Sequence, residues 1–498
     1  VTQPVTQPVT QPMHMLTRNG VATSSVLLML GVLVLLCLAG SCVAKSHPPH
    51  IYQSIAPYVA EFVGTYVLVF TIGCAVILDS STWSILTIAS ILMVMVYSTG
   101  AVSGGNLNPA VSWALFMAGN SCKADMHFCK MLRYWAVQVL AGICAGLSYC
   151  ALLSPRVVNV APGDGYTWQQ AGFAEMIYTF VLAFVVLNVA TVEDKADNCY
   201  FALSIGFTIL AGGYATMHVS GAIFNPAAAI GLEISSHSSQ NRGYGFRWAL
   251  FELLGGTLAS LVFGVVRRRD LSGKPTLLAK FTSEFIGTSV LVLTVGLNII
   301  TNELGPRALS AAAALMSMIY ALGDVSGAQF NPAVTLACYL RGATPPWRAA
   351  TFVVLQTAAG LFGGWLSAKF HVTSTQGLPK LAPGVEYTLF QAGFVELVFT
   401  AILAYTVLST STCKKTNQNF GLAIGFAVTA GGFAAGAISG GELNPAVSAG
   451  ITSASRALGG PPSCRMLMFF VLSELGGGVL ASLLFRITHN AEFAESEK

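Results

Sequence analysis

Long apolar runs, each of about 20 residues, recur along the chain and are separated by short polar loops. Two examples are "YVAEFVGTYVLVFTIGCAVIL" from Tyr58 and "IYTFVLAFVVLNVATV" from Ile177. An apolar run of this length crosses the hydrocarbon core of a bilayer as a helix. The pattern therefore predicts an all-α polytopic membrane protein.

Four shorter apolar stretches interrupt this pattern, and each begins with Asn-Pro-Ala. The triplets are Asn108-Pro109-Ala110, Asn225-Pro226-Ala227, Asn331-Pro332-Ala333 and Asn444-Pro445-Ala446. Asn is a good N-cap and Pro suits the first helical position, so each triplet predicts a helix start. Each stretch has only about ten residues, roughly half of a crossing at 1.5 Å per residue. We therefore expect four half-helices that begin inside the membrane.

A helix that begins inside a membrane has unsatisfied N–H groups and the positive end of its dipole there. Hydrocarbon penalises such backbone, so it must line a wet cavity or be covered by protein. Two half-helices that meet end to end would bring their Asn amides to the centre of a water-filled path. There the positive helix ends oppose cations and the amide donors orient water. The triplets therefore predict pores.

The chain is a repeat of repeats. Asn108 and Asn331 are separated by 223 residues, and Asn225 and Asn444 by 219. A weaker repeat lies within each unit, and each half of a unit holds three spans, so the two halves enter the membrane in opposite orientations. Twelve spans follow, six per unit. The expected boundaries are a first unit at 50–266, a linker at 267–275, a second unit at 276–488 and a tail at 489–498.

The segment before the first unit has a different pattern. Residues 1–24 contain "VTQPVTQPVTQP" and form a low-complexity leader, and residues 25–44 are apolar. The apolar segment fits either a signal peptide or a membrane anchor. Both alternatives conflict with the orientation that the charges indicate, which places both ends of each unit in the cytoplasm. Basic residues gather in the loops on that side, including Arg267 to Arg269, and are sparse in the opposite loops.

Composition narrows the class further. The chain is 54% hydrophobic and only 9% charged, too few charged residues for a soluble domain. The net charge of +4 is too small to indicate nucleic-acid binding. Cys122 and Cys129 lack the further ligands of a metal site, and no loop carries a nucleophile with a base. We expect no metal, no cofactor and no enzyme activity.

Each unit resembles a complete member of the aquaporin (major intrinsic protein) family, so the chain is similar to two aquaporins fused in tandem. The resemblance rests on the triplets, on the Ser-Gly that precedes each, on "AEF-x-GT" or "SEF-x-GT" in the first span, and on Gln138 and Gln356 in the third. It implies two six-helix bundles, each with its own pore. It also implies that four membrane carboxylates hold the re-entrant loops: Glu61, Glu175, Glu284 and Glu396. We expect a structural role for Glu252 and Glu474 too. Members of the family form tetramers, so two chains would give a homo-oligomer with four pores.

The chain departs from the family at the outer constriction. Water-selective members carry Arg directly after the second triplet, where this chain has Ala228 and Val447. The remaining constriction positions are Ile88, Gly213 and Ala222 in the first unit and Ala311, Gly432 and Gly441 in the second. A wider and less polar neck favours small neutral solutes (glycerol, urea, ammonia, metalloid acids) beside water. Glu442, expected near the mouth of the second pore, leaves slight cation passage as a minor alternative to neutral-solute conduction.

Two other functions stay open at this point. A structural or adhesion-type membrane protein would have closed pores. A coupled transporter would need an ion-binding carboxylate, for which Asp324, expected in a loop, is the candidate. The sequence leaves open whether the protein lies in the plasma membrane or an organelle membrane.

Overall fold

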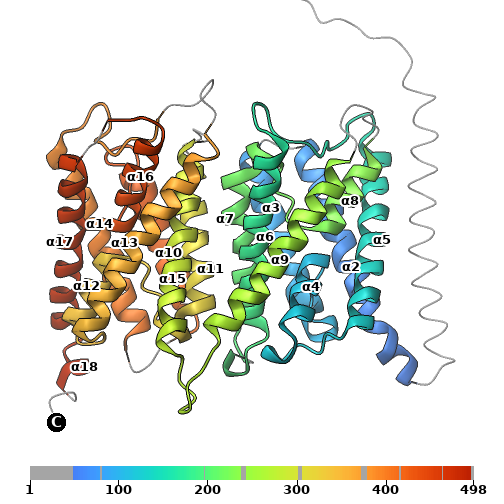
Figure 1. Ribbon diagram of the computed structural model, residues 1–498, viewed down its shortest axis with the longest axis horizontal. Coiled ribbons are helices and arrows are strands. Elements are labelled where there is room, and N and C mark those ends of the chain that lie inside the picture. Colours follow the sequence, from blue (N-terminus) through green and yellow to red (C-terminus); the bar gives the residue numbers. More distant parts are fainter. Residues whose placement is uncertain are drawn as a thin grey trace, which may run out of the picture.

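The computed structural model describes residues 49–494, apart from 79–80, 196, 237–242, 301–305, 372–377, 414–416 and 462–463. The expected leader at 1–24 and the apolar segment at 25–44 lie outside the described residues. The described chain forms two helical bundles that lie side by side (Figure 1). Its one β-bridge within the described residues joins Arg269 to Pro275, on either side of the turn that links the bundles.

The first unit contains six long helices, two short ones and two single 3-10 turns. They are α2 (Pro49–Leu78), α3 (Ser81–Ser103), α4 (Pro109–Ala118), η1 (Gly119–Ser121), α5 (Phe128–Leu153), α6 (Trp168–Ala190), η2 (Glu193–Lys195), α7 (Phe201–Ser220), α8 (Pro226–Ser235) and α9 (Tyr244–Val266).

The second unit repeats this order and adds a short final helix. Its helices are α10 (Leu277–Ile300), α11 (Arg307–Ser326), α12 (Pro332–Leu340), α13 (Pro346–Ala368), α14 (Leu389–Ser411), α15 (Phe420–Ala435), α16 (Pro445–Ala457), α17 (Cys464–Thr488) and α18 (Ala491–Ala494).

Eleven of the twelve predicted spans are helices that are long and apolar enough to cross a membrane, counted over the described residues. The twelfth, α15, is apolar but has only 16 residues. It ends at Ala435, and turns carry the chain on to Ser439, whereas its counterpart α7 is helical as far as Ser220. The second unit has Gly436 where α7 has Met217, and Gly is a much weaker helix former.

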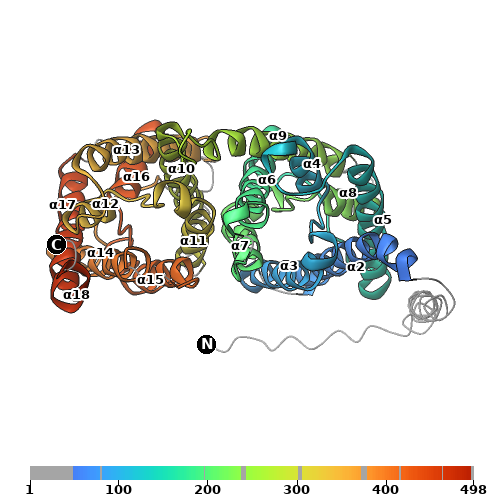
Figure 2. The same cartoon turned by 90° about the horizontal axis from the view of Figure 1, so that it is seen from below.

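The half-helices lie inside each bundle. Figure 2 looks along the bundles and shows the long helices of each unit surrounding the short ones. Helix α4 packs against α5 and α9, and α8 packs against the same two helices. In the second unit α12 packs against α13 and α17, as does α16. This is the arrangement that the inverted repeat predicts, because the two half-helices enter from opposite sides.

Glycine allows the spans to approach the half-helices closely. A Cβ atom on Gly142 of α5 would lie 2.2 Å from the carbonyl oxygen of Ala227, the third residue of a triplet. The equivalent distance from Gly360 of α13 to the carbonyl oxygen of Ala446 is also 2.2 Å. Any side chain at either position would push the half-helix away from the span. Small residues at helix contacts are how membrane helices reach such distances.

The two units meet through α6 and α7 of the first and α10 and α11 of the second. Tyr178 and Thr294 share a buried hydrogen bond of 2.9 Å between their hydroxyl oxygens. Ser310 Oγ donates to the carbonyl oxygen of Ala211 at 2.8 Å. The rings of Tyr200 and Tyr320 stack with their centroids 4.2 Å apart. The joint is therefore a packed interface with its own hydrogen bonds.

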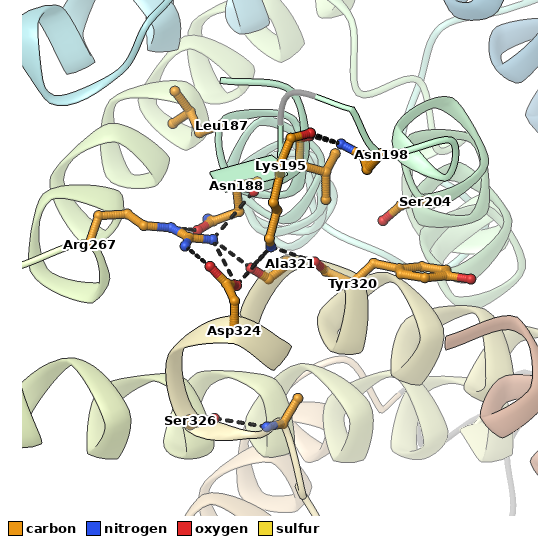
Figure 3. A network of polar contacts seen from close by, with 12 residues as sticks. Leu187, Asn188, Lys195, Asn198, Ser204, Arg267, Tyr320, Ala321, Asp324 and Ser326 are labelled. Atoms are coloured by element: carbon orange, nitrogen blue, oxygen red, sulfur yellow. Dashed lines mark hydrogen bonds and ion pairs between the residues drawn. The ribbon is translucent and has the colours of Figure 1, made fainter. Parts of the chain in front are cut away.

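Lys195, Arg267 and Asp324 form an ion-pair network at one end of this joint, which we call the joint cluster (Figure 3). Lys195 Nζ lies 2.8 Å from Asp324 Oδ1, and the Arg267 guanidinium pairs with Oδ2 of the same carboxylate. Lys195 also donates to the carbonyl oxygens of Tyr320 and Ala321, and Arg267 Nε to Asn188 Oδ1. The cluster therefore ties Lys195 and Arg267 to the second unit.

The joint cluster corrects two expectations. Arg267, expected as one of the basic residues of a cytoplasmic loop, has a side chain that is only 9% exposed, and the side chain of Lys195 is 6% exposed. Asp324, expected in a loop, lies in the last turn of α11. The charge pattern could not separate these residues from their solvated neighbours, because their partners are more than 50 residues away in the sequence.

Candidate functional site: two pores built on paired half-helices

Each half-helix begins at the Asn of its triplet. The side-chain oxygen of Asn108 accepts from the backbone N–H of Ala110 at 2.9 Å, and the other three Asn residues cap their helices in the same way. All four have extended backbone, and the Pro that follows is the first helical residue. The local sequence alone therefore sets where each half-helix starts.

The Asn amides also tie the two half-helices of a unit together. Asn108 Nδ2 donates to the carbonyl oxygen of Phe224 at 2.8 Å, and Asn225 Nδ2 donates to that of Leu107 at 2.9 Å. The second unit repeats this exchange through Asn331 and Asn444, at 2.9 and 3.0 Å. Each pair of Asn residues also lines a cavity. The half-helices therefore meet end to end, with their positive ends and amide groups at the middle of each bundle.

The residue before each Asn has left-handed backbone although none is glycine. The φ angles are 53° at Leu107, 53° at Phe224, 49° at Phe330 and 52° at Leu443. Non-glycine residues in this region carry strain, so surrounding contacts must hold the backbone there.

A buried carboxylate supplies those contacts in each half. Glu61 accepts from the backbone N–H groups of Asn106 and Leu107 at 3.0 and 2.7 Å, and from Ser103 Oγ at 2.6 Å. Gln138 Nε2 donates to the same carboxylate at 2.8 Å. A carboxylate with this many donors is fully occupied within the protein.

The other three carboxylates repeat the pattern. Glu175 binds the N–H groups of Ile223 and Phe224, and Glu284 those of Gln329 and Phe330. Glu396 accepts from the N–H of Leu443 at 2.8 Å and from Glu442 at 3.2 Å. The four are completely buried, and the Ser of the Ser-Gly pair donates to each.

One further buried carboxylate lies in the middle of the last span of each unit. Glu252 Oε1 accepts from the backbone N–H of Asn225 at 2.8 Å. Glu474 Oε1 accepts from Ser448 Oγ, one turn into α16, at 2.8 Å. Both contact the second half-helix of their unit, so they belong to its supporting structure.

The predicted constriction residues are distributed differently in the two units. Ala311, Gly432, Gly441 and Val447 all line one cavity in the second unit. In the first unit only Ile88 and Ala222 line the corresponding cavity. A Cβ on Gly213 would lie 2.4 Å from Ile85, so that side chain covers Gly213, and Ala228 is completely buried.

The second cavity has charged and polar lining residues that counting from the triplets did not find. They are Asn298, Arg307 and Lys380, and Glu442, which was expected near the pore mouth, lines the same cavity. Arg307 is the first residue of α11 and lies one turn before Ala311, so helical spacing would have placed it on the same face. The predicted constriction positions carry no Arg, but the cationic side chains of Arg307 and Lys380 line the same cavity.

Metal binding finds no support in the described part of the chain. No group of three or more His, Cys, Asp or Glu side chains is placed to hold an ion there. Cys122 and Cys129 are both free thiols.

Comparison with known proteins agrees with this geometry. The model of the major intrinsic protein family matches the chain twice, at residues 50–263 and 271–485. The chain belongs to the major intrinsic protein family. Both matches are of a whole unit, which confirms the tandem organisation. The same match confirms that the chain belongs to a family of channels and not to a family of enzymes.

Among its relatives within this family are plant aquaporins. "Aquaporin NIP1-3" from Oryza sativa subsp. japonica is 32% identical over 38% of this chain and 68% of its own length. "Aquaporin NIP2-1" from Zea mays is 32% identical over 39% of this chain and 65% of its own length. "Probable aquaporin PIP-type 7a" from Pisum sativum is 28% identical over 43% of this chain and 78% of its own length. Each relative aligns with about one unit.

Proposed function

We propose that this major intrinsic protein is a passive membrane channel for water and small neutral solutes, with one pore in each unit. One observation carries the proposal: in both units two half-helices meet end to end at an Asn pair that lines a cavity. Positive helix ends at that point oppose cations, and the amides orient passing molecules by hydrogen bonding.

The constriction supports solutes beyond water. Ala228 and Val447 stand directly after the second triplet of each unit, and neither carries a charge. Pore width and lining donors set selectivity in such channels, so a neck without Arg at this position favours neutral solutes such as glycerol and urea. Ammonia and metalloid acids belong to the same class of small uncharged molecules.

The two other functions have weaker support. Asp324, the carboxylate considered for a coupled transporter, is paired with Lys195 and Arg267 rather than open to an ion. The four loop-holding glutamates are occupied by backbone and serine donors. A structural protein with closed pores would not need the cavity that surrounds Asn331 and Asn444.

The test is stopped-flow swelling of vesicles that contain the purified protein, with water, glycerol and urea gradients. The matched variant is Asn225→Asp/Asn444→Asp, which places a carboxylate in each pore without changing side-chain size. We expect rapid flux of water and at least one solute in the wild type, and a fall to the level of empty vesicles in the variant. Absence of flux from folded wild-type protein would refute the channel proposal.

The joint also supports a homo-oligomer of two chains. Helices α6 and α7 contact α10 and α11 at the joint, and the repeat makes α14 and α15 equivalent to the first pair. Helices α2 and α3 are equivalent to the second pair. In a pair of chains, α14 and α15 of each chain could therefore pack against α2 and α3 of the other. These two equivalent contacts would close a ring of four pores. The mass of the detergent-solubilised particle, measured by light scattering, tests this.

The orientation rests on the placement of basic residues. Both ends of each unit lie at the face that carries the turn between α9 and α10 (Figure 1). Lys123, Lys130 and Arg268 lie on this face, and the positive-inside rule would place it in the cytoplasm. Labelling of a single introduced Cys in the turn, from one side of a sealed vesicle, tests the assignment.

A further inference from the structure

The two pores of the chain differ in size. The cavity around Asn331 and Asn444 in the second unit has a volume of about 350 Å³. The cavity around Asn108 and Asn225 in the first unit has a volume of about 30 Å³. The first cavity therefore has less than a tenth of the volume of the second.

The inner walls of the two cavities do not account for the difference. In the first unit Leu92, Ile205 and Ile209 line the cavity, and in the second Leu315, Ile424 and Val428 occupy the equivalent positions. These side chains are all aliphatic and similar in volume. The narrowing must therefore arise elsewhere along the pore.

The difference lies in the first turns of α3 and α11. The first unit has Ile85 and Ile88 there, whereas the second has Ala308 and Ala311 at the positions 223 residues later. Both isoleucines are buried, and Ile85 fills the space beside Gly213. In the second unit Ala308 is the side chain beside the equivalent glycine, and that glycine lines the cavity. Two larger aliphatic side chains therefore narrow the first pore, and the equivalent side chains of the second are only methyl groups.

The second cavity also has charged and amide side chains at three positions where the first unit has none. Asn298, Arg307 and Glu442 line it, and the equivalent residues in the first unit are Ala75, Ser84 and Ile223. Glu442 Oε2 is buried and accepts no hydrogen bond from a donor in the described chain. A wide cavity with acceptors and donors suits a solute that carries several hydroxyl or amide groups.

We propose that the pores are unequal: the second unit conducts neutral polyhydroxy or urea-type solutes, whereas the first passes nothing larger than water. This rests on the proposed channel function and assigns its solute flux to one unit. The specificity-determining residues are Ile85 and Ile88 in the first unit and Ala308 and Ala311 in the second, because they set the width of each neck.

The test exchanges these residues between the units and measures glycerol and water flux in vesicles. Ala308→Ile/Ala311→Ile recreates in α11 a pair that α3 already accommodates beside a glycine, so the fold should tolerate it. We expect glycerol flux in this variant to be at least about tenfold lower than in the wild type, because the neck of the conducting pore is filled. The reverse variant, Ile85→Ala/Ile88→Ala, should about double glycerol flux by opening a second pore.

Val94→Ala is the matched control. Val94 is also on α3 but 47% exposed and absent from the cavity lining, so its truncation should leave glycerol flux unchanged. Glycerol flux that survives the filling of the second pore would overturn the inference while leaving a working channel. Loss of glycerol flux in Asn225→Asp alone would overturn it too, because that variant changes only the first pore. Wild-type protein that conducts neither water nor glycerol would instead refute the channel function itself.

Discussion

We expect the joint cluster to contribute to the free energy of association of the two units. Asp324→Ala removes the one carboxylate that Lys195 and Arg267 share, and their side chains are only 6% and 9% exposed. Removing one partner of a buried ion pair costs about 3–5 kcal/mol, because a charge is left buried without compensation. Asp324 is itself 30% exposed, so water can replace part of the interaction and we expect the lower end, about 3 kcal/mol. At 1.4 kcal/mol per tenfold, this weakens association of the units by roughly 100-fold.

The assay measures dissociation of the two units, so the chain that joins them must first be cut. A protease site inserted between Ser272 and Gly273, in the exposed turn between α9 and α10, allows the chain to be cut after folding in detergent. The fraction of second unit that remains bound to an immobilised first unit is then measured over a dilution series. Wild-type halves should stay together to far lower concentration than Asp324→Ala halves.

Two controls separate this effect from general damage. Asp125 is 87% exposed and lies 3.6 Å from Lys130, so Asp125→Ala should change little, as exposed pairs contribute about 0–1 kcal/mol. Lys195→Met/Asp324→Ala removes a second buried charge and should recover part of the loss. If Asp324→Ala halves dissociate no more readily than Asp125→Ala halves, the cluster does not stabilise the joint and the reasoning is wrong.

Further outcomes follow from the same contacts. Gly360→Ala should lower the yield of folded protein, because its Cβ would lie 2.2 Å from the Ala446 carbonyl oxygen; size-exclusion profiles compared with Gly264→Ala, which has open space, check this. Glu284→Ala should abolish flux through the second pore, since the N–H groups of Gln329 and Phe330 lose their acceptor; glycerol flux that stays at the wild-type level would contradict it. Tyr178→Phe should weaken the joint by about 1 kcal/mol through loss of one buried hydrogen bond, and a double-mutant cycle with Thr294→Val in the cut-chain assay should show the two changes to be non-additive.

The sequence predicted those features that local chemistry determines. Asn followed by Pro sets a helix start wherever it occurs, so the four half-helices could be placed to the residue. The repeat then gave the two units and the equivalence of their helices. Span lengths were less certain, because the glycine at 436 shortens α15 without altering its apolar pattern.

Two features that depend on contacts between distant segments were not predicted. Ile88 and Ala311 were predicted as constriction positions, but the contact between Ile85 and Gly213 was not predicted, because it depends on which side chain covers Gly213. The joint cluster was missed for the same reason: Lys195 and Asp324 belong to different units, and the charge of each was explained by orientation or ion binding. A sequence pattern records the face on which a residue lies, but not the residue that lies opposite.

The covalent turn between α9 and α10 has a consequence for the composition of any assembly. Separate narrow and wide channel subunits, made from independent messages, would mix in proportions set by their expression levels. Here both are translated as one polypeptide, so every membrane that receives one kind receives the other in equal number. If two chains close a ring, unlike pores alternate around it and like pores lie diagonally opposite. The ratio of water to solute conductance would then be fixed by the coding sequence. The cell could not change it by expressing one kind of pore more than the other.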